Sequence, residues 1–347
     1  MSAFLLILTV ALVIIVVFQI GKSAELARIL RGEEGKEETN SSLALITSVI
    51  GFIILILSII TIFIYKPKFL PVSASEQGVW IQQMINWTMF FTCTVYIFTT
   101  FLLFWFVYKY QYKKDRKAFW FPDDLRLELA WTIIPAIVLT VLVVLGIQKW
   151  FKVFSPAPSD AIIVEAIGQQ FKWNIRYAGA DKILGKKDFS LTNSDNELGI
   201  NWNDKNSHDD FMADEIVLPV NTPVLFKLGA LDVLHNFNLS QFRMKMDCVP
   251  GIPTEYWMRP TISTDSMRLI TGNPEFDYEV NCSEMCGSAH YNMRKVLKVV
   301  SRAEYDKWAK DQSENHSYYK TVVLPAMKEK GGEISMNTDT TKNNIKH

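Results

Sequence analysis

Four long apolar runs, all before residue 151, constrain this sequence more than any other feature. They are AFLLILTVALVIIVVFQI (3–20), LALITSVIGFIILILSIITIFIY (43–65), WTMFFTCTVYIFTTFLLFWFVY (87–108) and LAWTIIPAIVLTVLVVLGIQKW (129–150). A helix needs roughly 20 apolar residues to cross the ~30 Å hydrocarbon core of a membrane. The first run has no basic residue ahead of it and no small-residue cleavage site, which favours a retained helix over a signal peptide. We therefore predict two additional membrane helices in residues 1–66 and a transmembrane hairpin anchor in residues 67–150.

Basic residues in the loops predict which helix ends face the cytoplasm, because Lys and Arg gather on that side. The loop after the third run is the most basic, with Lys109, Lys113, Lys114, Arg116 and Lys117. We therefore predict that residues 109–128 lie inside. The N-terminus and everything after residue 150 then lie on the outer, periplasmic side of a bacterial inner membrane. The formal net charge is +0, so the totals imply neither a strongly basic surface nor a strongly acidic one. We expect the membrane as a partner and no nucleic acid.

The outer half, residues 151–312, has the pattern of an all-β domain. Short apolar runs bounded by turn residues include AIIVEAIG, FKWNIRY, VLHNFNL, SMRLITG and RKVLKVV. Strands at this spacing predict a β-sandwich or a Greek-key barrel. We interpret residues 191–215 as a long polar surface loop. A helix is expected from Ser301, and residues 313–347 are interpreted as a polar, mobile tail.

Residues 282–293, CSEMCGSAHYNM, bring two thiols, a carboxylate, an imidazole and a thioether into one short segment. A second imidazole is available at His235, in DVLHNF. In an outer domain, Cys282 and Cys286 could simply form a disulfide. Zinc would accept the thiolates and imidazoles but has no use for the thioether of Met293. A mononuclear blue-copper site takes one Cys, two His and a Met, which leaves one Cys over.

Two copper ions bridged by both thiolates would use the whole set. Each ion would have both sulfurs, one imidazole and one weak axial ligand, which is Met293 on one side and a backbone carbonyl on the other. An electron shared over a compact sulfur-bridged core changes the metal–ligand distances little, so its transfer is fast. Because the neighbouring sequence offers no candidate for bond-breaking chemistry, we predict an electron-transfer site. The remaining cysteines, Cys93 and Cys248, are interpreted as packed residues.

DVLHNF and CSEMCGSAHYNM together resemble the binuclear copper (CuA) signature of subunit II of the haem-copper cytochrome c oxidases. The resemblance implies a cupredoxin-like sandwich and a complete ligand set. The implied side-chain ligands are His235, Cys282, Cys286, His290 and Met293, with the backbone carbonyl of Glu284. It also implies that the Glu284 side chain holds Mg2+ at the boundary with subunit I. Haem is expected only in partner subunits.

The resemblance extends into the membrane half, where LELAWTIIPAIVL (127–139) is similar to the second anchoring helix of the family. It implies that Glu128 takes up protons at the mouth of the K channel. From the residue alone, Glu128 is a favourable partner of the helix dipole. In GQQFKWNIRY, Phe171 stands where the family has the Trp that receives electrons from a c-type cytochrome, and Trp173 follows two residues later.

The expected function is therefore the subunit through which electrons pass from a c-type cytochrome to the oxygen-reducing, proton-translocating oxidase. Phe171 favours a donor held in a larger complex. An acidic rim would instead favour a freely diffusing basic cytochrome, and its candidates are Asp204, Asp209, Asp210, Asp214 and Glu215. Two other classes are a stand-alone membrane-anchored copper carrier, which would purify without haem, and a structural subunit of a quinol oxidase, which should lack the copper ligands.

Overall fold

The computed structural model describes residues 2–31 and 34–325. Contacts divide the chain into two compact units. One contains Met1–Leu70 and Asn86–Leu142, and the other contains Pro71–Ile85 and Val143–His347. The division passes through two long helices, so each of them contributes residues to both units.

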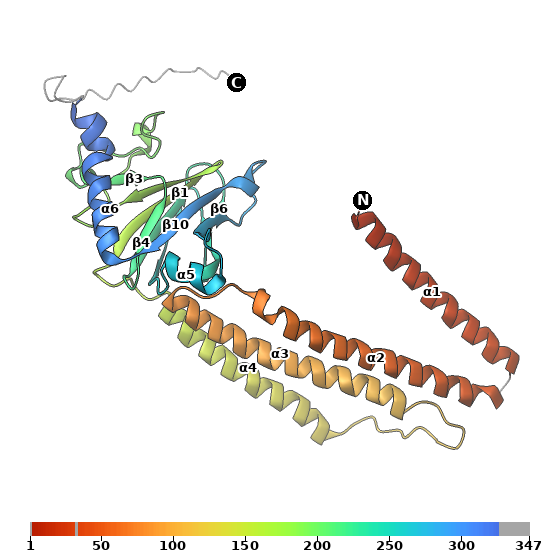
Figure 1. The fold of residues 1–347 in the computed structure, drawn as a ribbon. Helices are drawn as coiled ribbons and strands as arrows, with labels where there is room; N and C mark the ends of the chain where they lie inside the picture. Colours follow the sequence, from red (N-terminus) through yellow and green to blue (C-terminus); the bar gives the residue numbers. More distant parts are fainter. Residues whose placement is uncertain (1, 32–33, 326–347) are drawn as a thin grey trace, which may run out of the picture. The chain divides into compact units, whose positions relative to one another are not determined.

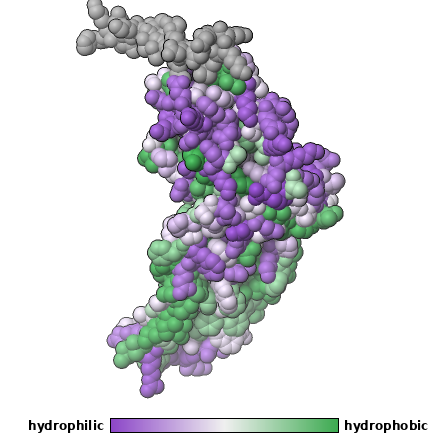
Figure 2. All heavy atoms as spheres, turned by 90° about the vertical axis from the view of Figure 1, so that its left-hand side faces the viewer, coloured by the Kyte–Doolittle hydropathy of each residue, from purple (hydrophilic) through white to green (hydrophobic). Residues whose placement is uncertain are grey.

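The N-terminal half is helical, as the apolar runs predicted. Its elements are α1 (Ser2–Arg31), α2 (Glu34–Phe69), α3 (Glu76–Lys109) and α4 (Leu125–Val153) (Figure 1). Within the described residues, three helical segments are long and apolar enough to cross a membrane: Glu37–Phe69, Glu76–Lys109 and Leu125–Val153. The apolar run at 3–20 lies in α1, and most side chains of this run are outside the described part of the structure. That this run crosses the membrane therefore stays a prediction. Apolar side chains gather on the helices, whereas the β domain is largely hydrophilic on its surface (Figure 2).

Helices α2 and α3 pack through small residues of the additional N-terminal segment. Ala44, Ser48 and Gly51 are buried and recur at helical spacing on one face of α2. The Ser48 hydroxyl donates to the carbonyl oxygen of Phe104 at 3.0 Å, and the Tyr96 hydroxyl donates to Ser58 Oγ at 3.0 Å. Small residues let two membrane helices approach closely, and hydroxyls then bond across the contact.

Two five-stranded sheets form the β domain, which confirms the predicted sandwich (Figure 1). Their order is β3-β2-β1-β5-β8 in one sheet and β4-β10-β9-β6-β7 in the other. The bounds are β1 (Ile162–Gln169), β2 (Lys172–Tyr177), β3 (Phe211–Ala213), β4 (Ile216–Pro219), β5 (Val224–Ala230), β6 (His235–Leu239), β7 (Met244–Cys248), β8 (Thr254–Met258), β9 (Tyr278–Cys282) and β10 (Arg294–Val300). Alternating buried side chains of both sheets fill the space between them.

The segment that precedes α3 is bonded to the same unit as the sandwich. The backbone N–H of Ala74 donates to Gln241 O at 2.7 Å, and the Ser75 hydroxyl donates to Phe242 O at 2.8 Å. Glu76, the first residue of α3, pairs with Arg259 at 3.1 Å. The first turns of α3 are therefore fixed to the β domain.

One predicted strand is a helix. SMRLITG lies in α5 (Thr264–Thr271), which begins after the N-cap Ser263 and ends at the left-handed Gly272. The Ser263 hydroxyl accepts from Ser266 N, and Gly tolerates the positive φ of 67° that ends the helix. The short apolar run suggested a strand, but the residues that cap its two ends stabilise a helix.

The interpretation of residues 191–215 as a surface loop is wrong in part. Leu198, Ile200 and Trp202 are buried in a second apolar cluster, which also contains Tyr319 and Val323. These last two belong to the π-helix η5 (Tyr319–Val323), which follows α6 (Arg302–Asn315). The polar segment expected from residue 313 therefore begins as packed structure, and residues 326–347 lie outside the described residues.

Candidate metal centre

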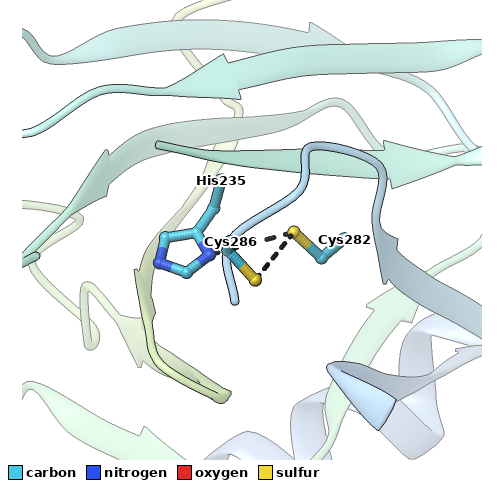
Figure 3. Close-up of side chains that lie close together, drawn as sticks. All are labelled: His235, Cys282 and Cys286. Atoms are coloured by element: carbon cyan, nitrogen blue, oxygen red, sulfur yellow. Dashed lines mark hydrogen bonds between the residues drawn. The ribbon is translucent and has the colours of Figure 1, made fainter. Parts of the chain in front are cut away.

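The sulfur and imidazole side chains of the predicted site converge at one end of the second sheet. His235 begins β6, Cys282 ends β9, and these neighbouring antiparallel strands place Phe237 opposite Cys282. Cys286 lies in the loop that follows β9. His235, Cys282 and Cys286 are buried, and their ligand atoms lie within 4.8 Å of one another. Figure 3 shows these three side chains pointing toward a common point.

Four possible ligand atoms surround the two sulfurs. His235 Nδ1 lies 3.8 Å from Cys282 Sγ, and the carbonyl oxygen of Glu284 lies 3.2 Å from the same sulfur. His290 Nδ1 lies 3.5 Å from Cys286 Sγ, and Met293 Sδ lies 3.8 Å from it. The structure therefore brings together all the residues that the sequence assigned to copper, including the backbone carbonyl.

The sulfur separation fits a shared metal ion. Cys282 Sγ and Cys286 Sγ are 3.9 Å apart and both thiols are free, whereas a disulfide bond is about 2.05 Å long. A metal–thiolate bond is roughly 2.3 Å, so one ion can bond to both sulfurs at the observed separation. Burial raises the pKa of the Cys286 thiol to about 11, and a metal must displace this proton when it binds.

Asp232 fixes the orientation of one imidazole. His235 Nε2 donates to Asp232 Oδ1 at 2.9 Å, which leaves the Nδ1 lone pair directed toward Cys282. Burial would raise the pKa of Asp232. Hydrogen bonds from the backbone N–H of Gln170, from His235 and from the backbone N–H of Val233 outweigh this effect and lower the pKa. Asp232 is a functional residue that was not predicted from the sequence, although a carboxylate three residues before a predicted His ligand is a usable signal.

The two aromatic residues assigned to electron uptake have different surroundings. Trp173 is only 1% exposed, and its ring centroid lies 6.0 Å from that of His235. Phe171 is partly buried and packs against the same core. A Cβ added at Gly287 would lie 2.9 Å from the Phe171 ring, so this ring contacts the loop directly after Cys286. The arrangement is compatible with either residue as a route for electrons.

The two carboxylates expected to act elsewhere are exposed. Glu284 contributes its carbonyl to the centre, and its residue lies at the surface. Glu128 is in the first turn of α4, where Asp124 Oδ1 accepts from the backbone N–H of Arg126 at 2.9 Å. Asp124 therefore supplies the helix cap, and Glu128 is not needed for it.

The fold and the site define a membrane-anchored β-sandwich with a cluster of two thiols, two imidazoles and a thioether that can hold metal. Two family models match this chain: "Cytochrome C oxidase subunit II, periplasmic domain" over residues 162–300, and "Cytochrome C oxidase subunit II, transmembrane domain" over residues 64–148. The alternative cytochrome c oxidase subunit 2 of Bradyrhizobium diazoefficiens is 32% identical over 269 residues, which are 76% of this chain and 91% of that protein. The chain therefore belongs to the cytochrome c oxidase subunit II family.

Other relatives are more distant. Cytochrome c oxidase subunit 2 of Cereibacter sphaeroides is 26% identical over 73% of this chain and 82% of that protein. The crystal structure of the periplasmic domain of cytochrome oxidase subunit II from Bradyrhizobium japonicum is 22% identical, with a TM-score of 0.30, over 45% of this chain and 96% of that one. Family membership makes the chain a membrane subunit of an oxidoreductase complex, with its copper domain on the outer side and other oxidase subunits as partners.

Proposed function

We propose that this chain passes electrons from a c-type cytochrome, through two copper ions, to the haem-copper subunit that reduces oxygen to water. The observation that carries the proposal is the pair of free thiols 3.9 Å apart, with an imidazole nitrogen and a weaker donor beside each. A structural zinc site needs four ligands and would leave Met293 unused. A blue-copper site would leave one thiolate unused.

The protein's contribution is to hold the ligands still. Strands β6 and β9 fix His235 and Cys282 within one sheet, and Asp232 sets the orientation of the His235 ring. Met293 is buried beside the start of β10. When bound, two bridged copper ions supply a carrier for one electron. Ligands held on a rigid sheet move little when the charge changes, which keeps the cost of electron transfer small.

Electron paramagnetic resonance of the oxidised protein tests the binuclear site. We expect two coppers per chain and hyperfine splitting from two equivalent copper nuclei. Replacing Cys286 with Ser removes one bridging thiolate and should leave at most a mononuclear signal. A wild-type spectrum from one copper nucleus would contradict the proposal. Haem that co-purifies with the chain would separate an oxidase subunit from a stand-alone copper carrier.

We assign Mg2+ to the exposed carboxylate of Glu284, at the boundary with the haem-copper subunit. The carbonyl oxygen of Glu284 lies 3.2 Å from Cys282 Sγ. A cation held by the side chain of the same residue would therefore lie close to the copper site. Mg2+ prefers carboxylate oxygens and keeps several waters, which suits a shared boundary. In the assembled oxidase, Glu284→Gln should abolish the signal of Mn2+ substituted at this site. An unchanged manganese signal would exclude Glu284 as a ligand.

For location, we propose a bacterial inner membrane with the N-terminus on the same outer side as the copper domain. The basic loop 109–128 supports this orientation, because short basic loops stay in the cytoplasm. The test is to treat intact spheroplasts with a membrane-impermeant thiol reagent. The reagent should label a Cys introduced near the N-terminus of the chain and should not label a Cys introduced at Lys113. The reverse labelling pattern would overturn the orientation.

A further inference from the structure

Gln170 lies in the turn between β1 and β2, and it hydrogen-bonds to both halves of the metal centre. Its backbone N–H donates to Asp232 Oδ2 at 2.7 Å. The other oxygen of the same carboxylate accepts from His235 Nε2 at 2.9 Å. The side-chain Nε2 of Gln170 donates to the carbonyl oxygen of Cys286 at 2.5 Å. One residue therefore links the loop before His235 with the loop that contains Cys286.

Two glycines allow close contact between this part of the chain and the loops that carry His235 and Cys286. A Cβ added at Gly168 would lie 2.8 Å from Cδ2 of the His235 ring, so only glycine gives this ring its space. A Cβ added at Gly287 would lie 2.9 Å from Gln170 Nε2 and from the Phe171 ring. Gly168, Gln170 and Phe171 thus contact the centre from a third side, although they supply none of its ligands.

Cys286 depends on such support because no strand fixes it. It follows β9 by four residues. The start of its loop is bonded to β6 through Ser283 N and Asn236 O at 3.2 Å, but later bonds, such as His290 N to Gly287 O at 3.2 Å, are local. A further hydrogen bond from outside the loop is needed to fix its part around Cys286 relative to His235. The Gln170 amide provides one, and it comes from the opposite sheet of the sandwich.

We propose that Gln170 is a positioning residue of the copper centre, which holds Cys286 in place relative to His235 through its side-chain amide. This inference rests on the proposed copper function. Without the amide, one hydrogen bond that restrains the Cys286 loop is lost. The Cys286 sulfur can then move relative to Cys282 and the two imidazoles, so the ligands no longer keep a single geometry. Loss of an interaction of this outer type commonly lowers metal affinity roughly 10–100-fold.

Two substitutions in the full chain, within its oxidase complex, test the proposal. Gln170→Glu keeps the size but replaces the donor amide with a carboxylate, and Gln170→Leu removes polarity altogether. The control is Gln169→Leu, because Gln169 is the adjacent glutamine and its Oε1 accepts only from Asn174 Nδ2, at 3.1 Å, among the bonds of the described residues. The measurements are copper retained against a chelator, the hyperfine pattern and the midpoint potential of the copper site.

We expect both Gln170 variants to lose copper to the chelator roughly tenfold more readily than wild type. Their hyperfine pattern should show unequal copper nuclei and their midpoint potential should shift, while Gln169→Leu behaves as wild type. Gln170 variants that match the control in all three measurements would overturn the inference. Loss of the β fold in Gln170→Glu, seen by circular dichroism, would also overturn it, because the role would then be structural. A wild-type chain without two coppers would instead defeat the proposed function.

Discussion

At the scale of single residues, the centre depends on close contacts as much as on ligands. Gly168→Ala is expected to displace the His235 ring, because the added Cβ would lie 2.8 Å from its Cδ2. Copper content per chain should fall well below that of wild type while circular dichroism stays unchanged. Gly229→Ala is a matched control on the paired strand β5, since its Cβ would meet only the end of Ile167 at 3.2 Å. Normal copper content in Gly168→Ala would contradict this prediction.

Glu128 is the residue on which proton uptake is proposed to depend. It lies in the first turn of α4, while Asp124 already caps this helix. Glu128→Gln keeps the size but cannot ionise. We expect normal copper and haem content, normal reduction of the copper centre and slower proton-coupled reduction of the oxygen-binding site, measured by stopped flow. A helix-dipole role is worth about 0.3–1 kcal/mol and would leave turnover unchanged. Unchanged kinetics at the oxygen site would therefore exclude the proton role.

At the scale of elements, the capping box of α6 gives a measurable stability effect. Ser301 Oγ accepts from the backbone N–H of Glu304, whose carboxylate accepts in return from the Ser301 N–H. The helix then packs Trp308 against Tyr177 and Phe211. Ser301→Ala should lower the free energy of unfolding by about 1 kcal/mol. Thermal unfolding of the chain in detergent measures it, and an unchanged midpoint would show that this end of α6 does not limit stability.

The same box has a predictable pH dependence. Hydrogen bonds from the Ser301 side chain and backbone lower the pKa of Glu304 from its ordinary value. The native state therefore favours the ionised form. Its contribution is present above the ordinary glutamate pKa and is lost as the pH falls through the lowered one. The difference in unfolding midpoint between wild type and Ser301→Ala should shrink below about pH 4. A difference that stays constant down to pH 2 would argue against the ionised cap.

At the scale of the whole molecule, the charge on the outer domain bears on the electron donor. Four of the five acids that could form an acidic rim already have local partners. Asp210 pairs with Arg176 at 2.8 Å, and Glu215 pairs with Lys298 at 2.7 Å. Asp204 and Asp209 accept backbone N–H groups. The exposed residues beside the metal ligands include three large hydrophobic side chains: Leu234, Met285 and Tyr291.

We therefore expect electron donation to rest on apolar contact more than on charge steering. In native membranes, turnover should change little as ionic strength rises, because salt screens charges over about 10 Å at 0.1 M and leaves apolar contact intact. This outcome fits a c-type cytochrome held in a larger complex. Oxygen consumption at increasing salt measures it, with purified cytochrome added in a parallel reaction. A steep decline in membranes without added cytochrome would favour a freely diffusing donor.

Local patterns were enough to predict much of this protein. Continuous apolar runs predicted the helices because crossing a membrane imposes a length and a composition. The spacing of Cys282, Cys286, His290 and Met293 led to the prediction that they bind copper because these residues lie in one short segment of the chain. Short patterns failed where caps or distant partners decide, as at α5 and in the apolar cluster around Trp202.

The sequence by itself determined the membrane anchor, the β domain and the chemistry of the ligands, since each depends on residues close together in the chain. Only the tertiary structure decided what surrounds those ligands. Strand pairing brings His235 beside Cys282, and the β1–β2 turn brings Gln170 against Cys286, 116 residues away. Such contacts depend on the order and register of the strands, which are set only when the whole domain packs. A local sequence pattern therefore cannot predict them.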